Sequence, residues 1–199
     1  MANRNTVGFG LQATGTMGSN YTNQGQSNYS IDAGDATAIY NGQAVKLTAG
    51  YIVTASAANT NNPLGVLNGV FYNATSTQKP TWNNYYPGGI TPANSEDTTA
   101  FVLDNPFQLY EASVNALMGA TQPAAVAATI GQTMGTQTAQ GSTTTGKSSQ
   151  SLVFATKATV ANTWRVLRGA ADPENEDMTA AWCTVVVVGN LNQIIDSSA

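Results

Sequence analysis

The fold is decided in residues 100–112, which read Ala-Phe-Val-Leu-Asp-Asn-Pro-Phe-Gln-Leu-Tyr-Glu-Ala. Side chains alternate between the two faces of a strand, so Phe101 and Leu103 are expected to share one face. Pro106 fixes its own φ and pushes Asn105 towards an extended conformation, so the chain must turn or bulge there. The stretch therefore predicts a strand, a corner and a second strand, with small hairpins before it and a long loop and closing strands after it.

The composition is polar but carries few charges. Charged side chains make up 9% of the 199 residues, against roughly 25% in an average domain. A chain of this length buries enough surface to fold without a disulfide or a metal. Uncharged polar side chains form hydrogen bonds at a lower desolvation cost than charges. This suits a surface that is buried against another protein, and equally a solvated extracellular surface.

Several functional classes are disfavoured by what the sequence lacks. Only seven residues are Lys or Arg and the net charge is −4, so no nucleic-acid partner is expected. No apolar run reaches the length of a membrane span, and the first residues lack the apolar segment of a secretory signal. The absence of histidine removes the usual general base and zinc ligand. We expect no enzyme activity, no metal and no cofactor, and a buried, inert thiol at Cys183.

Residues 1–29 are predicted to form an extended or disordered N-terminal arm ahead of a β-rich domain at residues 30–199. Apolar residues are sparse in the arm, although Val7, Phe9 and Leu11 alternate as in a short strand. Two interpretations are open: a disordered tail, or an arm that orders by adding to a neighbouring subunit. In the second, these three residues contact the partner, and deleting the arm leaves the fold intact.

The rest of the chain predicts a mainly β fold, a small β-barrel or sandwich with one or two short helices and long loops. Short strands recur between turn signals, as in barrels and sandwiches. Gly65 and Gly69 predict a bulge or tight bend within residues 64–72. The segment from Trp182 to Val188, which contains the unbroken β-branched run of residues 184–188, predicts a buried strand.

Local turn and helix signals add three expectations. Asn41-Gly42 favours a type I′ turn, so a hairpin is predicted over residues 38–47. Pro123 suits a first helical position and predicts a short helix over residues 123–130. A second short helix is predicted over residues 114–118.

Residues 80–92 form an aromatic loop with Trp82, Tyr85 and Tyr86 between prolines and glycines. One interpretation is a lid over a barrel end. The other is an anchor for an interface, because Trp and Tyr concentrate at binding hot spots. The two are weighed evenly, and the three aromatic residues are candidate contacts with another protein or subunit.

Residues Gly141–Ser148 read Gly-Ser-Thr-Thr-Thr-Gly-Lys-Ser and match the pattern of a phosphate-binding loop. That motif requires a buried strand before it and a helix after it. Here a polar segment precedes it and the strand-like residues 151–154 follow it. A chance match is therefore favoured, and Lys147 is expected to bind no nucleotide.

The segment Asp172–Asp177 is acidic and offers two interpretations. Clustered carboxylates are the oxygen ligands that Ca²⁺ prefers. The segment lacks the glycine and the spacing of an EF-hand loop, so a solvated turn is favoured. Arg165 and Arg168 are close enough in sequence to pair with it.

A set of segments in the second half of the chain resembles one known family. They are Phe101-Val-Leu-Asp-Asn-Pro, Tyr110-Glu111, Gly141–Ser148, Trp164-Arg-Val-Leu and Asp172-Pro-Glu-Asn-Glu. Together they resemble the head decoration, or cement, proteins of tailed phages. The first half resembles this family more loosely, in its extended start, its predicted hairpin and Pro63-Leu-Gly-Val. Asn105 and Lys147 depart from the Asp and Arg that the family pattern leads us to expect.

The resemblance implies a small β-rich domain on the outer face of an icosahedral shell, without catalysis. The implied partner is the major capsid protein, and a homo-oligomer, dimer or trimer, is expected. The implied location is the capsid exterior of the virion, after synthesis in the host cytoplasm. Three alternatives stay open: a tail or fibre component, a nucleotide-binding protein using Gly141–Ser148, and a carbohydrate-binding adhesin using Trp82 and Tyr85.

Overall fold

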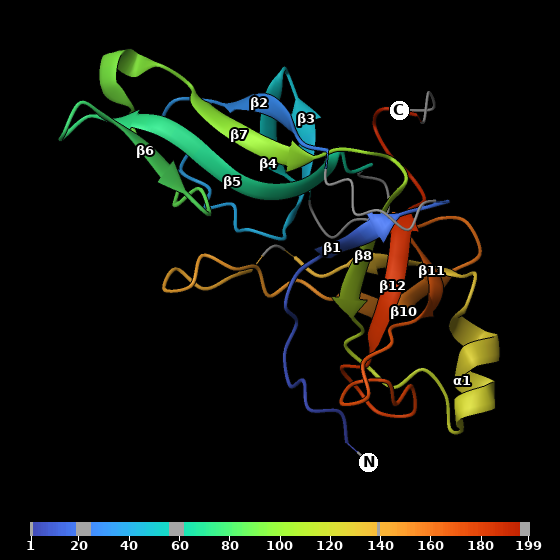
Figure 1. Cartoon of the computed structure of the whole chain (residues 1–199). Coiled ribbons are helices and arrows are strands. Elements are labelled where there is room, and N and C mark those ends of the chain that lie inside the picture. The colour runs from blue at the N-terminus through green and yellow to red at the C-terminus, as the bar shows by residue number, and fades with distance from the viewer. Residues whose placement is uncertain (1, 19–24, 56–61, 139, 196–199) are drawn as a thin grey trace.

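The computed structural model describes residues 2–18, 25–55, 62–138 and 140–195. Across these ranges the chain forms two six-stranded sheets and one α-helix. Figure 1 shows one sheet, mostly cyan to green, above the other, which contains the red strand β12. The predicted mainly β fold with a small barrel is confirmed.

The first sheet closes into a five-stranded barrel. Its strands, in order, are β3 (Ala44–Thr48), β4 (Tyr51–Thr54), β2 (Ser27–Ile31), β7 (Thr98–Leu103) and β5 (Gly65–Ala74). A pairing between β3 and β5 completes the circle, and β6 (Lys79–Asn83) adds to the outer edge of β5. The predicted bulge in β5 is confirmed, because its register with β7 shifts between Leu67 and Gly69.

The second sheet is antiparallel and strongly curled. Its strands, in order, are β1 (Gln12–Thr16), β8 (Gln108–Ser113), β12 (Thr184–Gly189), β11 (Trp164–Gly169), β9 (Thr133–Thr136) and β10 (Leu152–Ala158). Val114, just after β8, forms a bridge with Leu152 at the start of β10. The predicted buried strand is confirmed, because the five residues of β12 from Thr184 to Val188 are buried.

The corner at Asp104–Phe107 carries the chain from one sheet to the other. Alternation predicts a strand on each side, and β7 and β8 confirm both. The Asn105 carboxamide oxygen accepts a hydrogen bond from the Phe107 backbone N–H at 2.9 Å. The Tyr110 hydroxyl donates to the Leu103 carbonyl at 3.0 Å. These two bonds hold the ends of the strands together across the sheet-to-sheet passage.

The hairpin predicted over residues 38–47 and the helix predicted over residues 114–118 are wrong. The hairpin turn lies at Ala49-Gly50, between β3 and β4, where both residues have positive φ (51° and 88°). A turn does form at Asn41-Gly42, where the Gln43 N–H donates to the Tyr40 carbonyl at 3.1 Å, but it closes no hairpin, because Ile39 pairs with Tyr86. Gly42 also links the sheets: its N–H donates to the Leu67 carbonyl and its carbonyl accepts from the Leu11 N–H. Residues 114–118 are not helical, because their backbone pairs with neighbouring segments. The helix predicted over residues 123–130 is confirmed as α1 (Gln122–Thr129), capped by Thr121.

The described part of residues 1–29 is integrated into the fold of its own chain. The predicted boundary after residue 29 falls inside β2, and β1 pairs with β8. Leu11 is only 3% exposed and belongs to the core of the second sheet. Deleting residues 1–29 would remove β1, most of β2 and this core side chain, so we now expect the deletion to disrupt the fold rather than to leave it intact. Residues 19–24 of the predicted arm lie outside the described residues.

Candidate interaction surfaces

Three aromatic side chains form a cluster on the outer face of the barrel, which we call the aromatic cluster: Phe71, Trp82 and Phe101. They come from the adjacent strands β5, β6 and β7, which Figure 1 shows side by side. Phe71 lies directly opposite Trp82 in the ladder, and the Trp82 and Phe101 ring centroids are 5.0 Å apart. Trp82 is 53% exposed and Phe71 is 38% exposed. The cluster is therefore a continuous aromatic surface that the chain leaves open to solvent.

Gly69 makes this cluster possible. It lies opposite Phe101 in the ladder between β5 and β7. A Cβ atom at this position would lie 2.5 Å from Cζ2 of the Trp82 ring. The missing side chain leaves the space in which the indole crosses β5 and reaches Phe101. Only Trp82 of the cluster is predicted from the sequence; the combination of Gly69 with Phe71 is the signal that could have extended the prediction.

Strand β6 ends the barrel sheet at the aromatic cluster, and within the described ranges it pairs only with β5. Unpaired edge strands invite strand addition, and proteins block it with proline and charged residues. Lys79 and Pro80 occupy two of the five positions of β6. This edge is therefore suited to contacts through the aromatic side chains rather than to backbone pairing.

The other two predicted aromatic contacts lie elsewhere. Tyr85 stacks on Tyr40 with ring centroids 5.5 Å apart, and its hydroxyl donates to the Thr143 carbonyl at 3.3 Å. Tyr86 is fully buried in the barrel, where its hydroxyl donates to the Asp35 carbonyl at 2.8 Å. Tyr86 is buried, which suits the lid interpretation. Trp82 is exposed, which suits the anchor interpretation. Tyr86 and Leu11 are consequently left out of any contact surface.

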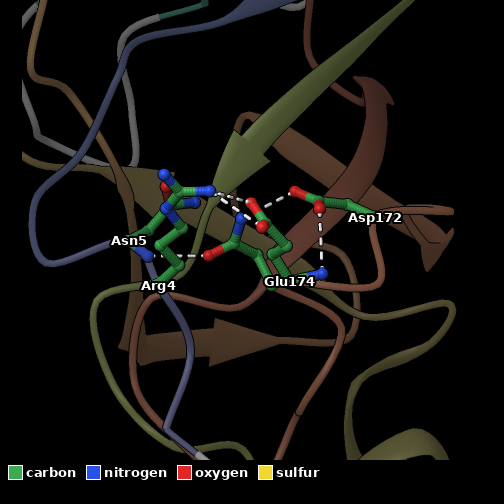
Figure 2. A network of polar contacts seen from close by, with 5 residues as sticks. Arg4, Asn5, Asp172 and Glu174 are labelled. Carbon is green, nitrogen blue, oxygen red and sulfur yellow. Dashed lines mark hydrogen bonds and ion pairs between the residues drawn. The ribbon is translucent and has the colours of Figure 1, made fainter.

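Residues 3–11, which we call the N-terminal strap, run along the second sheet and meet the acidic loop before β12. Figure 2 shows Arg4 and Asn5 facing this loop. The Arg4 guanidinium pairs with the Glu174 carboxylate at 2.6 Å, and this hydrogen bond raises the pKa of Arg4. The Asn5 N–H donates to the Asn175 side chain at 2.7 Å. Asp172 accepts from the Glu174 N–H at 3.2 Å.

The strap is also fixed by its buried polar groups. The Asn3 amide donates to three carbonyls of residues 177–181, at 2.9, 3.4 and 2.9 Å. Gly8 passes so close to the chain that a Cβ atom there would lie 2.2 Å from the Ser149 carbonyl oxygen. The acidic loop thus serves as the docking site of the strap. Across the described ranges, no group of three or more His, Cys, Asp or Glu side chains is arranged to hold a metal ion.

The Gly141–Ser148 segment is a closed loop in which several backbone N–H groups already donate hydrogen bonds within the chain. It follows β9 and precedes β10, so no helix begins at its end. The Ser142 N–H donates to the Lys147 carbonyl at 3.0 Å, the Gly146 N–H to Ser142 at 2.7 Å, and the Ser148 N–H to Asn41 at 2.8 Å. A phosphate-binding loop needs such N–H groups free and pointing at the ligand. Absence of nucleotide binding at Lys147 stays a prediction, now with a geometric reason.

An open pocket of about 350 Å³, which we call the strap pocket, lies between the strap and this loop. Its lining includes Val7, Gly8, Phe9, Ser142, Thr145 and Lys147. Val7 is 63% exposed and Phe9 is half-buried. The structure therefore brings two predicted arm contacts together with the glycine-rich motif, a combination that the sequence does not reveal.

Cys183 is buried in the core of the second sheet, and burial raises the pKa of its thiol to about 12.

A search of the described ranges for a helix that is both long and apolar enough to cross a membrane finds none. No family model, curated protein or solved structure matches this chain.

Proposed function

We propose that this protein is a virion structural protein, a head decoration protein that binds the outer face of a major capsid protein shell and stabilises the head. The aromatic cluster carries this proposal. An exposed Trp flanked by two Phe rings is the kind of surface that supplies most of the binding free energy at protein interfaces. The Trp82 ring is held in place by packing over Gly69 and against Phe101, so little side-chain entropy is lost when a partner covers it.

The rest of the surface supports the same function. Charged residues make up 9% of the chain, so a partner can cover the surface with few charges to desolvate. The sequence segments that resemble decoration proteins include the corner, which joins the two sheets. Many copies that each bind a symmetric shell would add up to strong reinforcement even when each contact is weak.

The test measures binding to shells. Particles that lack this chain are mixed with the purified protein, sedimented, and assayed for bound copies. Loss of the Trp82 side chain at a hot spot is expected to cost about 2 kcal/mol, or about 30-fold in affinity. Val160→Ala is the matched control, because Val160 is 65% exposed and lies outside the cluster. If Trp82→Ala and Val160→Ala bound equally well, the aromatic cluster would not be part of the interface.

Copy number separates the head from the tail. Quantitative mass spectrometry of purified particles is expected to give this chain in a simple ratio to the major shell protein. A handful of copies per particle would instead indicate a tail or fibre component. Absence from particles, combined with glycan binding that is lost in Trp82→Ala, would overturn the proposal in favour of a carbohydrate-binding adhesin.

A further inference from the structure

A pocket of about 270 Å³, which we call the charged pocket, lies on the outer face of the second sheet. Glu111 of β8 and Arg168 of β11 line two sides of it, and Val186 of β12 lies between them. We infer that the protein forms a two-fold dimer in which Arg168 of each copy enters the charged pocket of the other copy and pairs with its Glu111. This inference goes beyond the proposed function and stands whether or not the protein binds a shell.

The strand register places the three side chains in a row on one face of the sheet. Glu111 lies directly opposite Val186, and Val186 lies directly opposite Arg168; β8 and β12 are side by side in Figure 1. Residues that are directly opposite share a face of a sheet. Val185 and Val187 belong to the core on the other face, so the row points away from the core. Neighbouring strands are about 4.8 Å apart, so the two charged residues are about 10 Å apart across Val186.

Neither charge of this row is paired within the described part of its own chain. Glu111 and Arg168 take part in no hydrogen bond or ion pair there. The other two arginines of the chain are used: Arg4 pairs with Glu174, and Arg165 donates to the Asn190 side chain at 2.6 Å. Arg168 is exposed, whereas Glu111 is half-buried. An unpaired, half-buried carboxylate is therefore open to a guanidinium from outside, and such pairs form short, charge-assisted hydrogen bonds.

The row is complementary to a second copy of itself. A two-fold axis that runs parallel to β12 above Val186 exchanges the two sides of the row. It therefore places Arg168 of each copy opposite Glu111 of the other copy. Packed sheets lie about 10 Å apart, a gap that an arginine and a glutamate can span together. A partner with charges of one sign would leave one of the two groups unpaired, whereas a second copy pairs both and covers Val186 and Leu109 between them.

The experiment is sedimentation velocity on the full chain over a micromolar concentration series, in which the wild type is expected to show a monomer–dimer equilibrium. Glu111→Arg and Arg168→Glu each place two pairs of like charges in the interface. Each variant is therefore expected to associate at least about tenfold more weakly than the wild type. Lys147→Glu and Glu176→Arg are the matched controls, because they change the net charge equally at exposed positions outside the charged pocket. Both controls should associate like the wild type.

Reversal of both charges gives the decisive result. The double variant Glu111→Arg with Arg168→Glu exchanges the two signs and should restore the dimer. A mixture of the two single variants should form a one-to-one dimer, because one chain carries two arginines in the row and the other carries two glutamates. An ion pair between Glu111 and Arg168 within one chain predicts neither the loss of association nor its recovery.

Three outcomes would overturn the inference. They are a wild type that stays monomeric across the series, an assembly larger than a dimer, and a double variant and mixture that associate no better than the single variants. Thermal unfolding checks the fold of each variant. Arg168 is exposed, so Arg168→Glu is expected to fold even if Glu111→Arg does not. In that case, Arg168→Glu that associates as well as Lys147→Glu would by itself refute the two-fold contact.

Discussion

Replacement of Leu11 by alanine tests whether the N-terminal strap is part of the folded core in solution. Leu11 is 3% exposed and belongs to the same apolar core as residues of β8, β11 and β12. Truncating a buried leucine removes its transfer free energy and leaves a cavity, at a cost of about 2–5 kcal/mol. The backbone of Leu11 is also bonded to Gly42, which limits how far the strap can move to fill the cavity. We therefore expect the free energy of unfolding to fall by about 3 kcal/mol.

Urea denaturation followed by circular dichroism measures this change. With a slope of about 2 kcal/mol per molar urea, a loss of about 3 kcal/mol moves the midpoint down by about 1.5 M. The matched control is Val7→Ala in the same strap, which is 63% exposed and should change stability by less than about 0.5 kcal/mol. If Leu11→Ala and Val7→Ala had equal midpoints, the strap would not be docked on the sheet, and the core described for residues 3–11 would be refuted.

Three further outcomes follow from individual side chains. Gly69→Ala should push the Trp82 ring off β5, because the added Cβ would lie 2.5 Å from the ring. Iodide quenching of tryptophan fluorescence should therefore rise. Gly15→Ala is the control, because Gly15 has open space around it and the change should leave the quenching unaltered. Cys183 should resist a thiol reagent at about pH 8 until urea unfolds the protein, because burial raises its pKa to about 12. Burial, and to a lesser extent the hydrogen bond to Asp104, raises the pKa of Tyr29 from its ordinary value of 10.0 to about 12. Its stabilisation is thus complete below about pH 10 and is lost as pH rises through about 12, so the difference in urea midpoint between wild type and Tyr29→Phe should shrink over that range.

The features that follow from local chemistry were predictable from the sequence. Pro106 forces a corner whichever strands its two neighbours pair with. The strands β7 and β8 could therefore be placed without knowing their partners. Pro123 could be read as a helix start because a first helical position needs no N–H donor. The strand β12 is buried on both faces, so its valines form a continuous run without alternating polar residues, and this run is recognisable in the sequence.

The features that depend on distant partners were not predictable. Asn41-Gly42 does form a turn, but the segment before it pairs with Tyr86 and the segment after it pairs with β4 and β5, so the hairpin turn lies at Ala49-Gly50 instead. The burial of Leu11 requires β8, which is formed much later in the sequence. The aromatic cluster exists only because three strands align side by side, so Trp82 could be singled out while its neighbours could not.

The route of the strap constrains the order in which the protein can fold. Arg4 meets Glu174, which is 170 residues away in the chain. During synthesis the strap must therefore wait, undocked, until nearly the whole polypeptide has left the ribosome. Contacts between such distant residues close large loops and slow the final step of folding. Docking of the strap is therefore expected to be among the last steps of folding.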